Sequence, residues 1–453
     1  MPKEKKIFKE TDGVRGKANY FPLDVETVLK FGKALAEYTK KTIEKNPNRA
    51  YKVIIGKDTR RSGYMIEQAL TAGFLSRGVD VMTIGPAPTP AISHLVQSFA
   101  LDMGVMITAS HNPYHDNGIK VFHSNGRKFR DEEELEIEDL FFNFPFEGSE
   151  EIGRAKRIED VSGRYIEFIK SIPGNMSLKG FKIVVDCANG ATYSVSPTVF
   201  KELGAQVIEV GVNPDGYNIN KDCGALYPEN LKDIVLKEKA NLGIALDGDG
   251  DRVIMIDEKG NVIDGDYIMA MVAKYLKETG ELAKNTIVVT EYSNQALINH
   301  LIENGIEIVK VPNGDRAVAW KCEELGLNFG GEQTGHFLFT DYSEVGDGTL
   351  ASLIVMRILI EKKKTLSELA YVFDKYPQKV FNVEITKKIP LEEINEFQQT
   401  IKKWEKQFNG KGRVYSRYSG TENLLRIMVE AEDSDLIQKA GDELTGIAKA
   451  NLT

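Results

Sequence analysis

The sequence predicts an α/β protein in which three related α/β domains with mixed, mainly parallel sheets precede a smaller C-terminal α+β domain. At 453 residues the chain is too long for a single hydrophobic core. Short apolar runs alternate with helical stretches, which indicates mainly parallel strands joined by helices. The same order of strand, helix and strand occurs three times before the pattern changes. We therefore expect domains at residues 1–155, 156–257, 258–373 and 374–453, arranged around a central cleft.

The first unit leads to a polar loop that contains a serine. Its expected elements are a helix at 24–45, strands at 53–55, 79–84 and 104–108, and helices at 65–76 and 91–99. The last strand runs into Thr108-Ala109-Ser110-His111-Asn112-Pro113, where the Asn-Pro step forces a turn. Ser110 is therefore expected just past the carboxyl end of a strand, which is the usual ligand edge of an open α/β sheet.

The second and third units each deliver a polar, glycine-containing loop in the same way. A strand at 242–246 ends at Asp247-Gly248-Asp249-Gly250-Asp251-Arg252, and a strand at 253–256 leaves it. Residues 327–329 lead into Gly330-Gly331-Glu332-Gln333-Thr334-Gly335-His336, and an apolar run at 337–339 leaves this loop. Three similar units that each present one loop suggest a single cleft shared by three domains.

The last unit differs, because its strands at 380–385, 413–416 and 425–430 and its helices at 391–408 and 436–449 suit a small antiparallel sheet. The turn between its last two strands is Arg417-Tyr418-Ser419-Gly420-Thr421-Glu422-Asn423, and Arg426 follows. The hydroxyls of Ser419 and Thr421, the turn amides around Gly420 and the two arginines could form a phosphate site. A plain turn with incidental arginines is the alternative.

Composition limits the possible partners of the protein. The formal net charge of −9 argues against a general role on nucleic acids or membrane surfaces. The three cysteines are scattered singly, which suggests a reducing cytoplasm and argues against a zinc site or a disulfide framework. The N-terminus has no apolar signal core, and no apolar run is long enough to span a bilayer. We expect a cytoplasmic protein that acts on a small molecule.

The aspartate loop is a candidate metal site. Asp247, Asp249 and Asp251 alternate with glycines, so their carboxylates can converge on one hard cation. A calcium hand loop is disfavoured, because its flanking helices and its bidentate glutamate are missing. Mg²⁺ fits better, because it takes few protein ligands and completes its shell with a phosphate oxygen. A solvent-exposed Asp-Gly turn is the alternative. A phosphate on Ser110 would supply a further oxygen ligand, so a serine and a divalent cation together suggest phosphoryl transfer.

Four side chains are candidates for moving a proton or clamping charge: His111, His336, Lys120 and Arg15. Each histidine could act as acid or base, or could be structural. Lys120 and Arg15 could act in the same way or hold a phosphate by charge. This choice stays open at the level of the sequence.

The third loop suits a polyol ligand. Glu332 and Thr334 offer a carboxylate and a hydroxyl on a glycine-rich turn, which matches neighbouring hydroxyls of a sugar, although a plain tight turn is the alternative. Arg252 joins the expected substrate contacts from the end of the aspartate loop. The implied substrate is an anionic polyol whose own phosphate meets the turn at 417–426.

Together the loops TASHNP, DGDGDR, GEQTGH and RYSGTEN, in this order and spacing, resemble the α-D-phosphohexomutase superfamily. The resemblance covers nearly the whole chain and includes TDGVRG near the N-terminus and DNGIK at 116–120. It implies four domains around a central cleft and a phosphoserine at Ser110. It also implies one Mg²⁺ per subunit, bound by Asp247, Asp249, Asp251 and the serine phosphate. A homodimer is suggested by the resemblance alone.

Within the superfamily, GEQ and SGTE look most like phosphoglucosamine mutases, whereas phosphomannomutases and phosphoglucomutases more often have GEM and SNTE. The implied reaction interconverts glucosamine 6-phosphate and glucosamine 1-phosphate through a 1,6-bisphosphate, and a hexose 1,6-bisphosphate acts as activator. The product would feed UDP-N-acetylglucosamine synthesis for peptidoglycan. The alternatives are a phosphomannomutase or phosphoglucomutase of the same superfamily, or a catalytically silent sugar-phosphate-binding protein.

The sequence departs from the usual pattern of the superfamily at three places. Thr334 stands where serine is usual, which keeps the hydroxyl, and Asn423 stands where proline is usual. Lys9-Glu10 replaces the commoner glycine before Thr11-Asp12-Gly13. We expect little effect from Thr334 and a looser phosphate turn from Asn423, and the shape of the loop that carries Arg15 is open.

Overall fold

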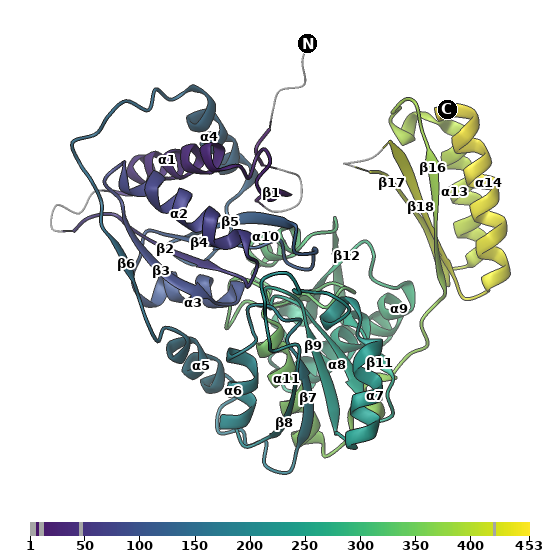
Figure 1. Ribbon diagram of the computed structural model, residues 1–453. Helices are drawn as coiled ribbons and strands as arrows, with labels where there is room; N and C mark the ends of the chain where they lie inside the picture. Colours follow the sequence, from purple (N-terminus) through teal and green to yellow (C-terminus); the bar gives the residue numbers. More distant parts are fainter. Residues whose placement is uncertain (1–5, 9–12, 45–48, 420–422) are drawn as a thin grey trace.

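The computed structural model describes residues 6–8, 13–44, 49–419 and 423–453, and it confirms the expected fold of three α/β domains and a small α+β domain. In Figure 1 the first domain, in purple and blue, lies at the left, the second and third lie below in teal and green, and the yellow C-terminal domain stands at the right. Within the described ranges, no helix combines the length and apolarity needed to cross a membrane.

The first domain is a six-stranded sheet with helices on both faces. Its strands lie in the order β1 (Val14–Lys17), β5 (Asp116–His123), β4 (Met103–Ile107), β2 (Lys52–Lys57), β3 (Asp80–Pro86) and β6 (Ala155–Arg157). Its helices are α1 (Val25–Thr42), α2 (Ser62–Leu75), α3 (Thr89–Ser98) and α4 (Asp131–Asn143). The strands β4, β2, β3 and β6 are parallel, whereas β5, which lies between β1 and β4, is antiparallel to both of these neighbours. All five residues of β4 are buried, as expected for a strand covered on both faces.

The second and third domains repeat this plan with shorter sheets. The second has the strand order β11 (Val262–Ile263), β10 (Val253–Asp257), β9 (Leu242–Leu246), β7 (Lys182–Asp186) and β8 (Gln206–Val210), with helices α5 (Ser162–Ser171), α6 (Val195–Glu202) and α7 (Glu229–Glu238). The third has the order β13 (Glu307–Val311), β12 (Thr286–Thr290), β14 (Phe329–Gly331) and β15 (Phe337–Phe339), with helices α8 (Gly265–Glu278), α9 (Gln295–Glu303), α10 (Asp315–Leu325), α11 (Gly348–Lys362) and α12 (Leu366–Ala370). Through β6 and β11, the first two sheets run a few residues past the boundaries expected at 155 and 257.

One feature recurs in all three sheets: a strand with a parallel neighbour is followed by an antiparallel strand. The connections are β4 to β5, β9 to β10 and β14 to β15. Each connection lies at the carboxyl end of the first strand, where open α/β sheets bind ligands. These three connections are the serine loop, the aspartate loop and the loop that ends at His336. The repeated strand order therefore places all three candidate loops at equivalent positions.

The helix α11 forms the centre of the largest core. Its buried residues lie on every side of the helix, and they belong to a core that joins the second and third domains and reaches α3 of the first. A second core fills the space beneath α1 and α2. The polar loops therefore project from domains that are packed together through shared buried apolar side chains.

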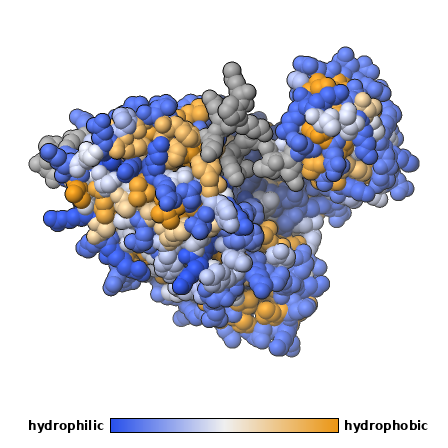
Figure 2. Space-filling view, turned by 45° about the horizontal axis from the view of Figure 1, so that its top comes forward, coloured by the Kyte–Doolittle hydropathy of each residue, from blue (hydrophilic) through white to orange (hydrophobic). Residues whose placement is uncertain are grey.

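The C-terminal domain is an antiparallel sheet with two long helices. Its strand order is β16 (Gln378–Glu384), β18 (Leu424–Ala431) and β17 (Gly412–Tyr418), and α13 (Asn395–Phe408) and α14 (Ser434–Leu452) pack on the sheet around a separate core. It meets the third domain at the residues that follow β12. There the Arg413 guanidinium donates to the carbonyl of Ser293 at 2.5 Å, and Glu430 accepts from the backbone N–H of Gln295. Figure 2 shows the surface hollowed between this domain, at the upper right, and the rest of the molecule.

Candidate functional site

Ser110 lies in the serine loop with its side chain turned toward the aspartate loop of the second domain. Its Oγ donates a hydrogen bond of 2.6 Å to Asp247 Oδ2 and lies 3.3 Å from Nδ1 of His111. The residue is only 4% exposed, and its φ of +49° is uncommon for a residue other than glycine. Such backbone strain persists only where the surroundings enforce it, and it is common at functional sites.

Arg60 holds the serine loop in this conformation. It is a fully buried residue that the sequence analysis missed. Its guanidinium donates to the carbonyl oxygens of Ser110 and Asn112, both at 2.8 Å, and to that of Pro113 at 2.9 Å. Asp58 holds the other side of the guanidinium at 2.9 Å. Their position in the sequence could have pointed to them, because Asp58 and Arg60 follow β2 at the same edge of the sheet as Ser110.

The three carboxylates of the aspartate loop are brought together inside the protein. Asp247 and Asp249 are fully buried, Asp251 is 3% exposed, and one oxygen of each lies within 4.8 Å of the others. Lys120 of β5 places its ammonium 2.8 Å from Asp249 Oδ2 and 3.0 Å from Asp251 Oδ2. Thr89, at the start of α3, donates to Asp249 at 2.6 Å. The predicted neighbours Ser110, Lys120 and the three aspartates therefore form one cluster.

The electrostatics of the cluster are unbalanced. Burial, together with the charges of Asp251 and Asp249, raises the pKa of Asp247 well above its usual range. Burial acts in the same direction on Asp249, but the adjacent Lys120 ammonium outweighs it and holds the pKa of that carboxyl below its usual range. Lys120 therefore stabilises the charged form of Asp249, whereas burial beside two other carboxylates disfavours the charged form of Asp247.

The donor set fits a hard divalent cation. Among the described residues, Asp249 Oδ1 and Asp251 Oδ1 are buried oxygens without a hydrogen-bond partner. Unsatisfied buried acceptors are costly, and a cation would satisfy both at once. All three side chains offer carboxylate oxygen only, which is the donor type that Mg²⁺ prefers. The residues present are therefore suited to hold such an ion.

The loop that ends at His336 is joined directly to the aspartate loop. Arg252 and His336 form an antiparallel bridge, and the N–H of Val253 donates to the carbonyl of Gly335 at 2.9 Å. Glu332 is 7% exposed, and its Oε1 accepts from the backbone N–H of Gly314 at 3.0 Å. Thr334 is exposed at the tip of the turn. The structure thus places Glu332 and Thr334, the two residues predicted to contact a sugar, on a loop that lies beside the aspartate loop.

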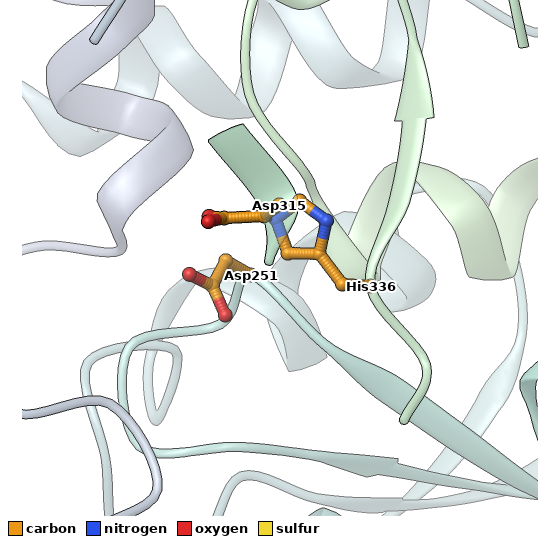
Figure 3. A group of neighbouring side chains, drawn as sticks. All are labelled: Asp251, Asp315 and His336. Carbon is orange, nitrogen blue, oxygen red and sulfur yellow. The ribbon is translucent and has the colours of Figure 1, made fainter. Parts of the chain in front are cut away.

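A second polar group extends the cluster toward the first domain. Figure 3 shows Asp251, Asp315 and His336 facing one another from three different segments, and Nε2 of His336 lies 3.4 Å from Asp315 Oδ2. The ammonium of Lys128 contacts the same oxygen of Asp315. Because this lysine already supplies positive charge, we interpret the group as an ion-pair network and not as a second metal site. Asp315 and Lys128 were missed by the sequence analysis, although Asp315 follows a Pro-Asn-Gly turn after β13.

His111 lies in the same charged surroundings. Burial lowers its pKa to about 4, and the positive charges of Arg252 and Arg15 contribute, against the opposing charges of Asp251 and Asp249. The imidazole is therefore neutral near neutral pH. These interactions also place Arg15, from β1, and Arg252, from the aspartate loop, around the same serine.

The predicted phosphate residues lie in the C-terminal domain. Arg417 and Arg426 are direct partners across β17 and β18, and Arg417 Nε also donates to Tyr292 of the third domain at 3.1 Å. Like charges directly opposite each other repel, so this pair is suited to bind an anion. Ser419 is buried, and its carbonyl accepts from Lys388, a cation that the sequence analysis missed, at 3.0 Å. Gly420 and Thr421 lie outside the described residues, as do Lys9 and Glu10.

The fold and the cluster define a multidomain α/β enzyme with a site suited to phosphoryl transfer, built where three domains meet. All four domains of the phosphoglucomutase/phosphomannomutase family match this chain: the α/β/α domains I, II and III at residues 5–147, 163–260 and 264–376, and the C-terminal domain at 381–446. The chain belongs to this family.

Curated relatives are similar over the whole chain. A phosphoglucosamine mutase of Geobacter sp. (strain M21) is 47% identical, and the alignment covers 99% of this chain and 98% of the relative. A phosphoglucosamine mutase of Bdellovibrio bacteriovorus is 44% identical, with 100% of both chains covered.

Solved structures share the fold. A phosphoglucomutase/phosphomannomutase family protein from Burkholderia thailandensis aligns with a TM-score of 0.81 at 23% identity, over 98% of both chains. N-acetylphosphoglucosamine mutase of Aspergillus fumigatus, in complex with GlcNAc-6P and magnesium, aligns with a TM-score of 0.66 at 20% identity, over 98% of this chain and 96% of that one. At these identities the likeness establishes the four-domain architecture alone.

Proposed function

We propose that this protein is a phosphoglucosamine mutase that interconverts glucosamine 6-phosphate and glucosamine 1-phosphate. The observation that carries the chemistry is the contact of 2.6 Å between Ser110 Oγ and Asp247, inside a cluster of three buried carboxylates. The amino sugar is supported by the curated relatives, which are phosphoglucosamine mutases at 44–47% identity over nearly the full chain. The product would supply UDP-N-acetylglucosamine synthesis.

In this proposal Ser110 carries the phosphate that is exchanged, and Asp247, Asp249 and Asp251 hold one Mg²⁺ per subunit together with an oxygen of that phosphate. When bound, the ion would polarise the phosphoryl group and neutralise charge that develops during transfer. A hexose 1,6-bisphosphate would act as activator by phosphorylating Ser110. Arg60 keeps the serine loop rigid, because it binds three carbonyl oxygens of the loop.

The protein's own side chains handle charge and protons around the serine. Lys120 lies within hydrogen-bond distance of Asp249 and Asp251, and it is suited to hold charge on the transferring group. Arg15 and Arg252 add positive charge at the same place. His336 is the group that would exchange a proton with the reacting sugar hydroxyl. Its ring nitrogens are buried and lack hydrogen-bond partners among the described residues. His111, neutral and 3.3 Å from Ser110 Oγ, is suited to exchange a proton with the serine oxygen.

Substrate would bridge two domains. Glu332 and Thr334 would bind sugar hydroxyls, and Arg417, Ser419, Gly420, Thr421 and Arg426 would hold the phosphate that is not reacting. Because its two arginines would bind a phosphate through its negative charge, this site can hold the 1-phosphate or the 6-phosphate equally well. The bisphosphate intermediate could therefore turn over and return its other phosphate to Ser110.

A cytoplasmic location is part of this proposal, and it is supported by Cys187, Cys223 and Cys322, which are free thiols.

The test is intact mass and peptide mapping of the purified protein before and after incubation with glucosamine 6-phosphate and Mg²⁺. We expect a phosphate on the peptide that contains Ser110, exchange of that phosphate with sugar phosphate, and turnover that Ser110→Ala abolishes. Ser124→Ala, in an exposed turn of the same domain, is the matched control and should keep full activity. Turnover in the Ser110→Ala protein would disprove the mechanism. A higher kcat/KM for mannose or glucose phosphate than for glucosamine phosphate would move the protein to another branch of the family.

A further inference from the structure

The turn before α10 contacts two polar side chains, Glu332 and His336, of the loop that ends at His336. The backbone N–H of Gly314 donates to Glu332, and the side chain of Asp315 approaches His336 with 3.4 Å between Oδ2 and Nε2. Gly314 has a φ of +128°, a backbone conformation that other residues rarely adopt. This turn therefore presents one backbone donor to Glu332 and one carboxylate to His336, the two side chains of the loop to which the proposed function gives roles.

His336 needs an external group to fix its orientation. The residue is 2% exposed, and neither ring nitrogen has a hydrogen-bond partner among the described residues. Gly346 packs on the ring so closely that an added Cβ would lie 2.3 Å from Nε2. This packing restrains the ring but supplies no polar partner. Figure 3 shows the carboxylates of Asp315 and Asp251 on the side of the ring that carries Nε2.

Asp315 is itself held by a residue of another domain. The ammonium of Lys128 contacts the oxygen of Asp315 that faces His336, and the side chain of Lys128 is only 8% exposed. Lys128 belongs to the turn after β5, where it pairs with Phe122 in an isolated bridge. Asp315 is also the first residue of α10, where the helix dipole favours a negative charge. The carboxylate is therefore fixed by both the first and the third domain.

We propose that Asp315 is a positioning residue for His336, and that Lys128 locks this pair when the first domain packs against the third. The proposal rests on the proposed function, since His336 matters only if sugar hydroxyls react here. A well-oriented imidazole would then depend on the correct packing of two domains. Proton transfer would consequently be efficient only in the assembled site, where Ser110 and the aspartate loop are also in place.

A purely structural tether between the domains is the competing explanation, and the chain offers a matched control for it. Arg127, the neighbour of Lys128, crosses the same domain boundary through Glu344 at 2.9 Å and through Glu323. These contacts do not involve Asp315 or His336. Arg127→Met therefore removes a tether of similar kind without touching the proposed positioning pair.

The experiment measures kcat, KM and thermal stability for Asp315→Asn, Lys128→Met, Lys128→Arg and Arg127→Met in the full-length, Mg²⁺-loaded protein with glucosamine 6-phosphate. We expect Asp315→Asn and Lys128→Met to lower kcat about tenfold to a hundredfold, as misplacement of a catalytic group does. KM should change by less than about threefold, because the group acts on the reacting hydroxyl and not on binding. Lys128→Arg should recover most of the kcat, and Arg127→Met should keep it.

A double-variant cycle distinguishes a positioning role of Asp315 from a purely structural one. In a His336→Gln background, Asp315→Asn should lower kcat less than about twofold further, because a positioning residue has no effect once its target is gone. An equal loss in both backgrounds would overturn the inference, and so would an Arg127→Met protein that loses as much kcat as Lys128→Met. Either result leaves the proposed function intact, because that function is tested separately by turnover of the wild-type protein and by phosphate exchange at Ser110.

Discussion

Ser110 and Asp247 lie 137 positions apart in the chain and belong to different domains, yet the serine hydroxyl donates to the carboxylate at 2.6 Å. A phosphate on this hydroxyl would add about −1.5 to −2 charges beside three buried carboxylates. Lys120 contacts Asp249 and Asp251 directly, and the Arg252 guanidinium lies 3.8 Å from Asp251. A divalent cation would compensate the negative charge that phosphorylation adds to this group. Four predictions follow from this arrangement and from its supports.

Lys120→Met should make folding strongly dependent on a divalent cation. Removing one partner of a buried ion pair costs about 3–5 kcal/mol, since the remaining carboxylates are left uncompensated. We expect a loss of this size in urea denaturation with EDTA, and partial recovery when Mg²⁺ replaces the missing charge. Lys201→Met, which breaks an exposed pair with Glu209, should change stability by less than about 1 kcal/mol. Equal stability of Lys120→Met and wild type in EDTA would contradict this charge balance.

Arg60→Met should disrupt the serine loop, because three carbonyl oxygens and Asp58 lose their partner inside the protein. We expect the free energy of unfolding to fall by about 3–5 kcal/mol, with loss of phosphate exchange at Ser110. Arg60→Lys keeps the charge but not the planar fork, so it should be more stable than Arg60→Met while remaining poorly active. Arg61→Met, at the exposed neighbouring position, is the control and should match wild type. A fully active Arg60→Met protein would show that the loop does not depend on this clamp.

Arg426→Gln should weaken substrate binding. A charge-assisted hydrogen bond contributes about 1.5–3 kcal/mol, so KM for glucosamine 6-phosphate should rise about tenfold or more. The melting temperature of the variant, measured alongside, separates a loss of phosphate binding from a loss of fold stability. Lys411→Gln, which removes an exposed cation of the same domain, should leave KM unchanged. Destabilisation with an unchanged KM would mean that Arg426 serves the fold and not the phosphate.

Asp347→Asn should change how stability depends on pH. Burial raises the pKa of Asp347 to about 6, despite hydrogen bonds from Tyr165 and the backbone of Leu350 that lower it. A folded-state pKa above the unfolded value gives stability that is present below about pH 4 and is lost as the pH rises through about 6. The asparagine does not titrate, so the variant should gain up to about 3 kcal/mol relative to wild type between about pH 4 and pH 7. Urea denaturation at several pH values checks this, and a constant difference would refute it.

Much of the fold could be predicted because the pattern of apolar residues specifies local structure directly. Strands such as β4 and β9 are continuous apolar runs bounded by polar loops, and the sequence analysis located both. The helix α11 was not predicted, because its buried residues lie on all sides and leave no amphipathic period to recognise. Ser110, Lys120 and the three aspartates were identified because their residue types suggest chemistry within short motifs.

Arg60, Lys128 and Asp315 were not identified, because each acts through contacts with segments that lie far away in the sequence. Arg60 binds residues 50 to 53 positions later, and the pair of Lys128 and Asp315 spans 187 positions. A single arginine or lysine in a turn is usually solvated, so nothing local marks these side chains as buried. Their burial becomes apparent only when the domains are packed together.

The sequence by itself determined many of the strands, the three repeated units and the chemical character of each loop, because these depend on residues that are close in the chain. The tertiary structure decided which loops meet: Ser110 on Asp247, Lys120 on Asp249 and Asp251, and Lys128 on Asp315 beside His336. These contacts depend on how separate sheets pack around shared cores. That packing is set by the summed burial of many apolar side chains and not by any one motif.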